Sequence, residues 1–168
     1  MRKLAIAIDG PAGAGKSSVA KILAANMGYA YLDTGAMYRA VTYEVLRREL
    51  TEEKDIVALA AGIDMTVKPE VDTMHVIVNG HDVTDYIRTP EVSAKVSAVS
   101  ALAGVRAAMV EIQRRQAAEG GIVLDGRDIG TTVLPHADVK IFLTASAHTR
   151  ALRRFKEMTE KNPGMTLE

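Results

Sequence analysis

A phosphate-binding pattern, G-x-x-x-x-G-K-[ST], is matched near the N-terminus by Gly10-Pro11-Ala12-Gly13-Ala14-Gly15-Lys16-Ser17. Glycines let the main chain curl closely around an anion, and a helix that follows presents the positive end of its dipole to the same anion. Lys16 adds a cation that reaches β and γ phosphates, and the Ser17 hydroxyl suits Mg²⁺, which prefers oxygen ligands. The segment therefore predicts a site for a nucleoside triphosphate.

The residues on both sides of this loop have the periodicities that the pattern requires. Before it, residues 4–9 form a short apolar run of strand length. After it, apolar residues recur at helical spacing, namely Val19, Ile22, Leu23 and Met27. The other interpretation, a flexible glycine turn with a surface lysine, does not require such flanks. We therefore expect a strand, a phosphate loop and a helix, with the nucleotide bound by residues 10–17 and Ser18.

The composition limits the class of protein. With 168 residues, of which 48% are hydrophobic, the chain suits one domain with at most a small insertion. Lys and Arg together number 21, as do Asp and Glu, so the chain lacks the positive field that recruits nucleic acid or an anionic membrane. The absence of cysteine excludes disulfides, and the N-terminal apolar run stops at Asp9, too early for an export signal. We expect a cytoplasmic monomer with no nucleic acid or membrane as partner.

Strands and helices alternate along most of the chain. Three further apolar segments have strand length, at residues 29–33, 122–125 and 139–143. Helical spacing marks three more segments, from Gly35 to about Leu50, from Thr51 to Ala61, and after a capping Ser146. This alternation predicts an α/β fold with a doubly wound parallel sheet whose ligand lies at the carboxyl ends of the strands.

One section interrupts this alternation. From Ile63 to Tyr86 the apolar residues follow a period of two, and Asn79-Gly80 is a strong signal for a two-residue hairpin before residues 81–83. Thr89-Pro90 then opens a helix that Gly104 is expected to break, and a second helix follows over residues 105–118. We therefore expect a small antiparallel sheet inserted into the parallel one.

Several classes of protein share the phosphate loop. A guanine-reading Asn-Lys-x-Asp element is missing, which argues against a switch GTPase, and the chain is short for a motor subunit. A small-molecule kinase needs a second anion pocket that faces the loop when its acceptor is itself charged. The remaining residues must therefore be searched for such a pocket.

Four segments resemble those of bacterial-type cytidylate kinases, a branch of the nucleoside monophosphate kinase family of phosphate-loop kinases. They are Ile8 to Ser17, Leu32-Asp33-Thr34-Gly35-Ala36-Met37-Tyr38-Arg39, Ile87-Arg88-Thr89-Pro90-Glu91-Val92 and Leu124-Asp125-Gly126-Arg127-Asp128-Ile129-Gly130-Thr131. The resemblance implies a single kinase domain over residues 1–168 that lacks its C-terminal part. It also implies a monophosphate-binding insertion at 63–103, which contains the small sheet, and the start of a lid at 146–168.

The resemblance also implies roles for acceptor-side residues. Arg39 and Arg127 would grip the phosphate of CMP, since a guanidinium matches phosphate oxygens bidentately; the alternative for each is a surface ion pair. Ser97, Arg106 and Asp128 would read cytosine. Thr34 would touch the acceptor phosphate, or else cap the helix after it. With Lys16, the two phosphate-binding arginines form the expected catalytic set.

Further residues are expected around ATP. Ser17 is the predicted Mg²⁺ ligand, and Asp9 and Asp125 either hold Mg²⁺ through water or serve as turn and cap carboxylates. In the basic helix after Ser146, Arg154 is predicted to reach the triphosphate together with Arg150, and a solvated basic face is the alternative.

The resemblance implies in-line transfer of the γ-phosphoryl group of ATP to CMP or dCMP, which needs alignment and cations more than covalent chemistry. Two alternatives stay open: a kinase of another small phosphate acceptor, and a truncated nucleotide-binding module without turnover. The chain stops within the expected lid, so we expect it to be part of a longer polypeptide or a shortened one.

Overall fold

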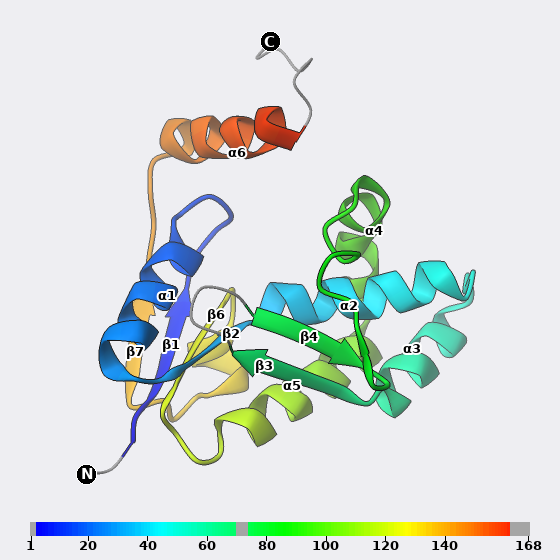
Figure 1. Ribbon diagram of the computed structural model, residues 1–168, viewed down its shortest axis with the longest axis horizontal. Coiled ribbons are helices and arrows are strands. Elements are labelled where there is room, and N and C mark those ends of the chain that lie inside the picture. The colour runs from blue at the N-terminus through cyan, green and yellow to red at the C-terminus, as the bar shows by residue number, and fades with distance from the viewer. Residues whose placement is uncertain (1–2, 70–73, 162–168) are drawn as a thin grey trace.

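The central sheet consists of parallel strands in the order β2-β6-β1-β7 in the computed structural model, which describes residues 3–69 and 74–161 (Figure 1). The bounds of these strands are β1 (Ala5–Asp9), β2 (Ala30–Asp33), β6 (Ile122–Gly126) and β7 (Val139–Phe142). In the register, Asp9 lies opposite Gly126 and Asp33 lies opposite Asp125. The carboxyl ends of β2, β6 and β1 therefore meet at one edge of the sheet.

Helices cover both faces of this sheet because side chains alternate along each strand. Ile6 and Ile8 pack with buried alanines of α1 (Lys16–Met27) on one face. Ala7 points to the other face, into the larger core that holds α2 (Thr34–Arg47) and α5 (Ala103–Ala117). The predicted doubly wound α/β fold is confirmed.

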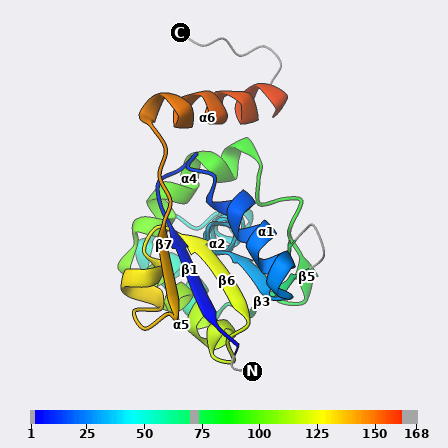
Figure 2. The ribbon, with the colours of Figure 1, turned by 90° about the vertical axis from the view of Figure 1, so that its left-hand side faces the viewer.

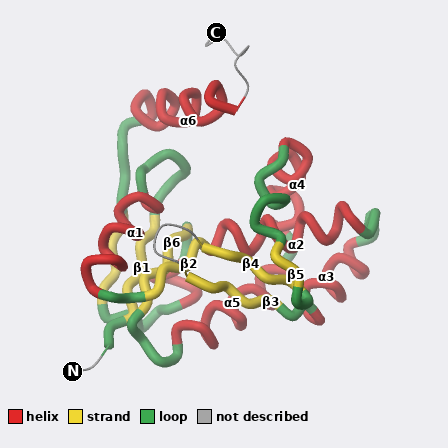
Figure 3. Tube along the Cα trace, in the orientation of Figure 1, coloured by secondary structure: helices red, strands yellow, loops and turns green. Residues whose placement is uncertain are grey.

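The small second sheet is also confirmed. It is antiparallel, with β3 (Met65–Pro69), β4 (Met74–Val78) and the short β5 (His81–Asp82) in sequence order (Figure 3). Asn79 and Gly80 join β4 to β5 with φ angles of 49° and 80°, the positive values that a tight hairpin turn requires. Met74, Val76 and Val78 face the larger core, which fixes the register of the hairpin.

Two further helices, α3 (Glu53–Gly62) and α4 (Pro90–Ala101), differ from the predictions at their boundaries. The expected start of α3 at Thr51 is wrong by two residues, since the helix begins after Glu52. The helix break expected at Gly104 lies instead at Leu102, and Gly104 belongs to the first turn of α5. A Cβ on Gly104 would come within 2.4 Å of the Val57 side chain on α3, so this glycine permits close packing of two helices.

The start of α2 corrects another expectation. The side chain of Asp33 caps this helix and accepts a hydrogen bond of 3.0 Å from the Ala36 amide. The alternative role of Thr34 as the cap is therefore wrong, and the helix ends at Arg47, earlier than expected. A five-residue π-helix, η1 (Ile129–Val133), follows β6 and has no counterpart in the sequence prediction.

The last described helix, α6 (Ala147–Lys161), stands beyond the carboxyl edge of the sheet, connected to it through β7 (Figure 2). Its predicted cap is confirmed, because Ser146 Oγ accepts a hydrogen bond of 3.1 Å from the Thr149 amide. Within residues 3–69 and 74–161, no single helix has the length and apolar composition to cross a membrane, and only the bent pair of α4 and α5 meets both criteria jointly.

Candidate functional site

The predicted phosphate loop leaves β1 at Gly10 and closes on the first turn of α1. Gly10 has a φ of 151°, and a Cβ there would lie 2.0 Å from the Leu143 carbonyl oxygen, so a side chain cannot be accommodated. Gly15, in the left-handed region, caps α1 directly before Lys16. The first amides of α1 and its positive dipole end therefore face the inside of the loop.

Lys16 lies at the centre of this loop. Its ammonium donates a hydrogen bond of 2.9 Å to the Pro11 carbonyl oxygen across the loop. Burial lowers the pKa of Lys16, the Asp125 carboxylate opposes this shift, and Arg127 adds to it. The lysine thus lies between the loop and the residues that follow β6.

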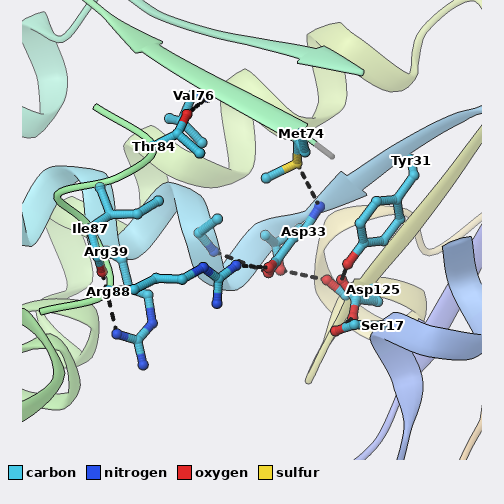
Figure 4. Close-up of polar contacts among 12 residues, drawn as sticks. Ser17, Tyr31, Asp33, Arg39, Met74, Val76, Thr84, Ile87, Arg88 and Asp125 are labelled. Carbon is cyan, nitrogen blue, oxygen red and sulfur yellow. Dashed lines mark hydrogen bonds and ion pairs between the residues drawn. The ribbon is translucent and has the colours of Figure 1, made fainter. Parts of the chain in front are cut away.

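Asp125 lies beside the loop at the end of β6, as its position at a strand end predicted (Figure 4). The Ser17 hydroxyl donates to Oδ2 over 2.7 Å, and the Tyr31 hydroxyl donates to Oδ1 over 3.2 Å. Burial and the negative charge of Asp33 raise the pKa of Asp125 to about 6. Serine and aspartate oxygens therefore lie together next to the loop.

A cavity of about 450 Å³ adjoins the loop. Lys16 contributes to its wall, and so does every residue predicted for the acceptor, namely Thr34, Arg39, Ser97, Arg106, Arg127 and Asp128. These residues come from α2, α4, α5 and the segment after β6. The structure thus gathers residues that are almost one hundred positions apart around one volume of ligand size.

Arg39 projects from α2 and is held against the first turn of α4 and the segment before it. It donates hydrogen bonds to Ser93 Oγ over 2.9 Å and to the Ile87 carbonyl oxygen over 3.4 Å. Burial lowers the pKa of Arg39, and the neighbouring cations Arg88 and Arg154 add to this shift. Such a concentration of positive charge at a cavity wall favours an anionic ligand.

The residues predicted to read cytosine include a direct contact. Arg106 of α5 forms an ion pair with Asp128, which places a donor fork and a carboxylate side by side on the cavity wall. Thr34, at the start of α2, donates from its hydroxyl to the Asp125 carbonyl oxygen over 2.8 Å. Ser97 lies on α4 at the same cavity.

Comparison with known proteins decides the family. Residues 6–168 match the family model described as cytidylate kinase. The chain belongs to the cytidylate kinase family.

Individual members of the cytidylate kinase family are similar over almost the whole chain. Identity is 50% with the cytidylate kinase of Desulfitobacterium hafniense over 99% of this chain and 72% of the relative. It is 53% with that of Limosilactobacillus fermentum (96% and 72%) and 52% with that of Bacillus licheniformis (99% and 75%). The chain therefore spans roughly three quarters of the length of these relatives.

Among solved structures, TT1252 from Thermus thermophilus aligns over 99% of this chain and 75% of that one, with 18% identity and a TM-score of 0.45. The family expected from the sequence motifs is confirmed by the sequence comparisons.

Two arginines of α6 contact the phosphate loop directly. Arg153 donates to the Gly13 carbonyl oxygen over 3.1 Å, and Arg150 donates to that of Ala12 over 3.5 Å. Arg154 pairs with Glu157 over 3.4 Å, and its predicted contact with the triphosphate stays a prediction. Sequence reasoning assigned no contact to Arg153, although its spacing of three from Arg150 places both on one helix face.

The Asp9 carboxylate is hydrogen-bonded to the main chain. Both of its carboxylate oxygens accept main-chain hydrogen bonds at the start of η1, so the structure favours the capping alternative that the sequence left open. Sequence reasoning also gave no role to Asp33 and Tyr38, which line the cavity. Their positions next to Thr34 and Arg39 were the available signal.

Proposed function

We propose that this chain transfers the γ-phosphoryl group of ATP to CMP or dCMP, forming ADP and CDP or dCDP. The observation that carries this proposal is the single cavity in which Lys16 of the phosphate loop lies with two arginines and three base-reading candidates. Membership of the cytidylate kinase family supports the choice of acceptor.

On the acceptor side, Arg39 and Arg127 hold the phosphate of CMP, with Thr34 beside them at the start of α2. Both arginines line the cavity that Lys16 and Asp125 also line. Planar guanidinium groups bind phosphate oxygens in pairs, which fixes the orientation as well as the position of the acceptor.

Three other residues of the cavity wall read the cytosine base. Asp128 accepts from the cytosine amino group, Arg106 donates to the ring acceptors, and Ser97 completes the set. The ion pair between Arg106 and Asp128 keeps both groups in place before a ligand arrives. A uracil presents a carbonyl where cytosine has its amino group, so it would face the Asp128 carboxylate with a second acceptor.

On the donor side, residues 10–17 and Ser18 surround the triphosphate and offer it the main-chain N–H groups of every residue but Pro11, and Lys16 neutralises charge between the β and γ phosphates. Mg²⁺ fits here because the Ser17 hydroxyl and Asp125 carboxylate supply hard oxygen ligands 2.7 Å apart. Ser17 and Asp125 would hold the ion, which would supply positive charge to stabilise the negative charge that develops on the phosphates.

The proposed start of the lid spans residues 146–168, of which 162–168 lie outside the described residues, and α6 supplies its arginines. Arg150 and Arg153 already lie on the loop carbonyls of Ala12 and Gly13, within reach of a triphosphate held there. A closed lid excludes water, which otherwise competes with the acceptor for the phosphoryl group.

The chemical step is an in-line displacement. An oxygen of the CMP phosphate forms a bond to the γ-phosphorus while the bond from that phosphorus to the β–γ bridging oxygen breaks, and ADP leaves. No general base is required, since the acceptor phosphate is already ionised near neutral pH. The protein contributes alignment and cations, with Lys16, Arg39 and Arg127 in these roles.

One coupled assay of ADP formation with CMP, dCMP, UMP, AMP and GMP tests the proposal. We expect turnover with CMP and dCMP, and a loss of several orders of magnitude in Lys16→Ala with the fold intact. Equal rates with AMP and CMP would favour a kinase of another acceptor, and ATP binding without turnover would favour a binding module. That the chain is monomeric and cytoplasmic, with no nucleic-acid or membrane partner, stays a prediction. Sedimentation and cell fractionation test it.

A further inference from the structure

Asp9 forms a buried link between two segments that each belong to a different half of the site. It is the last residue of β1 and directly precedes Gly10 of the phosphate loop. Its Oδ1 accepts from the Ile129 amide over 2.7 Å, and its Oδ2 accepts from the Gly130 amide over 2.8 Å. Only 8% of Asp9 is exposed, so water does not replace these bonds easily.

The two amides that Asp9 binds directly follow Arg127 and Asp128. The main chain leaves β6 at Gly126, opposite Asp9 in the sheet register, and turns over the end of β1. On the N-terminal side of these amides, β6 holds the chain in the sheet. The amides belong to the first two residues of η1, where the Thr132 amide donates to the Asp128 carbonyl oxygen. The Asp9 carboxylate thus fixes the C-terminal end of the turn that presents Arg127 and Asp128.

We infer that Asp9 is a positioning residue for acceptor recognition, which sets the places of Arg127 and Asp128 through the Ile129 and Gly130 amides without touching either nucleotide. The inference rests on the proposed function, since it assigns those two residues to CMP. It also means that the strand carrying the donor loop holds the acceptor segment through one side chain.

The chemistry of the link requires a carboxylate. Two converging N–H donors need two acceptor oxygens, and an amide side chain offers one oxygen and one further donor. An asparagine at this position would direct its N–H₂ group at a main-chain N–H in a buried site, leaving both of these donors without an acceptor. The segment after Gly126 would then shift, and the shift would appear in acceptor binding first.

A pair of isosteric variants tests this. Asp9→Asn should raise the KM and calorimetric Kd for CMP about ten- to one-hundredfold, with the Kd for ATP changed by less than about threefold. The matched control is Asp138→Asn, because Asp138 also accepts a main-chain hydrogen bond from β1, at the Ala5 amide over 2.8 Å, at the opposite end of the strand. The control should leave both nucleotides unaffected.

A double-mutant cycle separates positioning from general weakening of the fold. If Asp9 acts through the turn, its replacement should cost much less CMP affinity in an Asp128→Ala background than in the wild type. Full additivity of the two losses would overturn the inference. So would an unchanged Kd for CMP in Asp9→Asn, or an equal rise in the Kd values for ATP and CMP.

If Asp9→Asn does not fold, Gly130→Ala tests the other end of the link. A Cβ there would lie 3.3 Å from Asp9 Oδ2 and 3.2 Å from the Lys140 side chain, so it should displace the turn slightly and weaken CMP binding selectively. Unchanged CMP binding would overturn the inference. Failure of wild-type turnover with CMP would contradict the proposed function, whereas the Asp9 inference is decided by CMP binding relative to the wild type.

Discussion

Arg39 is the acceptor-side cation whose removal is easiest to interpret, because its helix α2 is held by other residues that pack in the larger core. Arg39→Ala should raise the KM for CMP about ten- to one-hundredfold, since hydrogen bonds to charged groups are lost, with little change in the KM for ATP. Arg47→Ala on the same helix is the control, since that residue is half exposed and pairs with Glu44. Steady-state kinetics with each nucleotide varied would measure both. A CMP KM that stays at the wild-type value would exclude Arg39 from the site.

The raised pKa of Asp125 predicts that this carboxylate lowers the stability of the folded chain, although we expect turnover to need it. Its pKa is raised by burial and by Asp33 to about 6, so in the folded state it binds a proton that the unfolded chain releases near pH 4. The free energy of unfolding therefore falls as the pH rises from about 4 to about 6, and the whole decrease applies above about pH 6.

Replacing this carboxylate should reveal the penalty. At pH 7.5 the free energy of unfolding of Asp125→Asn should exceed that of the wild type by roughly 2–3 kcal/mol, and at pH 4 the two values should be nearly equal. Chemical denaturation without nucleotide or divalent cation measures this, and the kinase assay should show lost turnover. A stability difference that does not vary with pH would contradict the assignment.

At the scale of helices, the contact between α3 and α5 depends on Gly104. Gly104→Ala should destabilise the chain by about 1–2 kcal/mol, because the added methyl meets Val57 and the clash outweighs the gain in helix propensity. Gly62→Ala on α3 is a suitable control, since nothing lies within 4 Å of a Cβ there. Thermal and urea unfolding would measure both variants.

A second substitution identifies the cause of that loss. In Val57→Ala the methyl groups that the new Cβ would meet are gone, so Gly104→Ala should cost less there than in the wild type. An equal cost in both backgrounds would show that the helices are not in contact at this point.

At the scale of the whole molecule, α6 is the element most separate from the body of the chain (Figure 2). In the structure its arginines bind loop carbonyls, and a triphosphate in the loop offers them stronger, charge-assisted partners. ATP should therefore slow amide hydrogen exchange across 147–161, and the protection should be reduced in Arg153→Ala. The remote helix α3 serves as the internal reference and should not respond. Equal exchange of α6 with and without ATP would contradict a lid role.

Local patterns in the sequence determined the phosphate loop, the parallel strands and the hairpin of the small sheet. The loop is specified by glycines with a lysine and a serine within eight residues, and Asn79-Gly80 supplies the positive φ angles that its turn needs. In the small sheet, alternation of apolar residues likewise marked the buried face of β4. The acceptor residues came from the resemblance to cytidylate kinases, and their roles stay predictions, although one cavity joins them.

Tertiary structure alone decided the partners of individual side chains. Asp9 binds amides 120 and 121 residues away, a separation that no local pattern encodes, so its role as metal ligand or cap was undecidable from sequence. Gly104 looked like a helix breaker because glycine has low helix propensity, yet its missing side chain admits Val57 from another helix. The sequence thus set the chemistry available at each position, and packing between distant segments set its use.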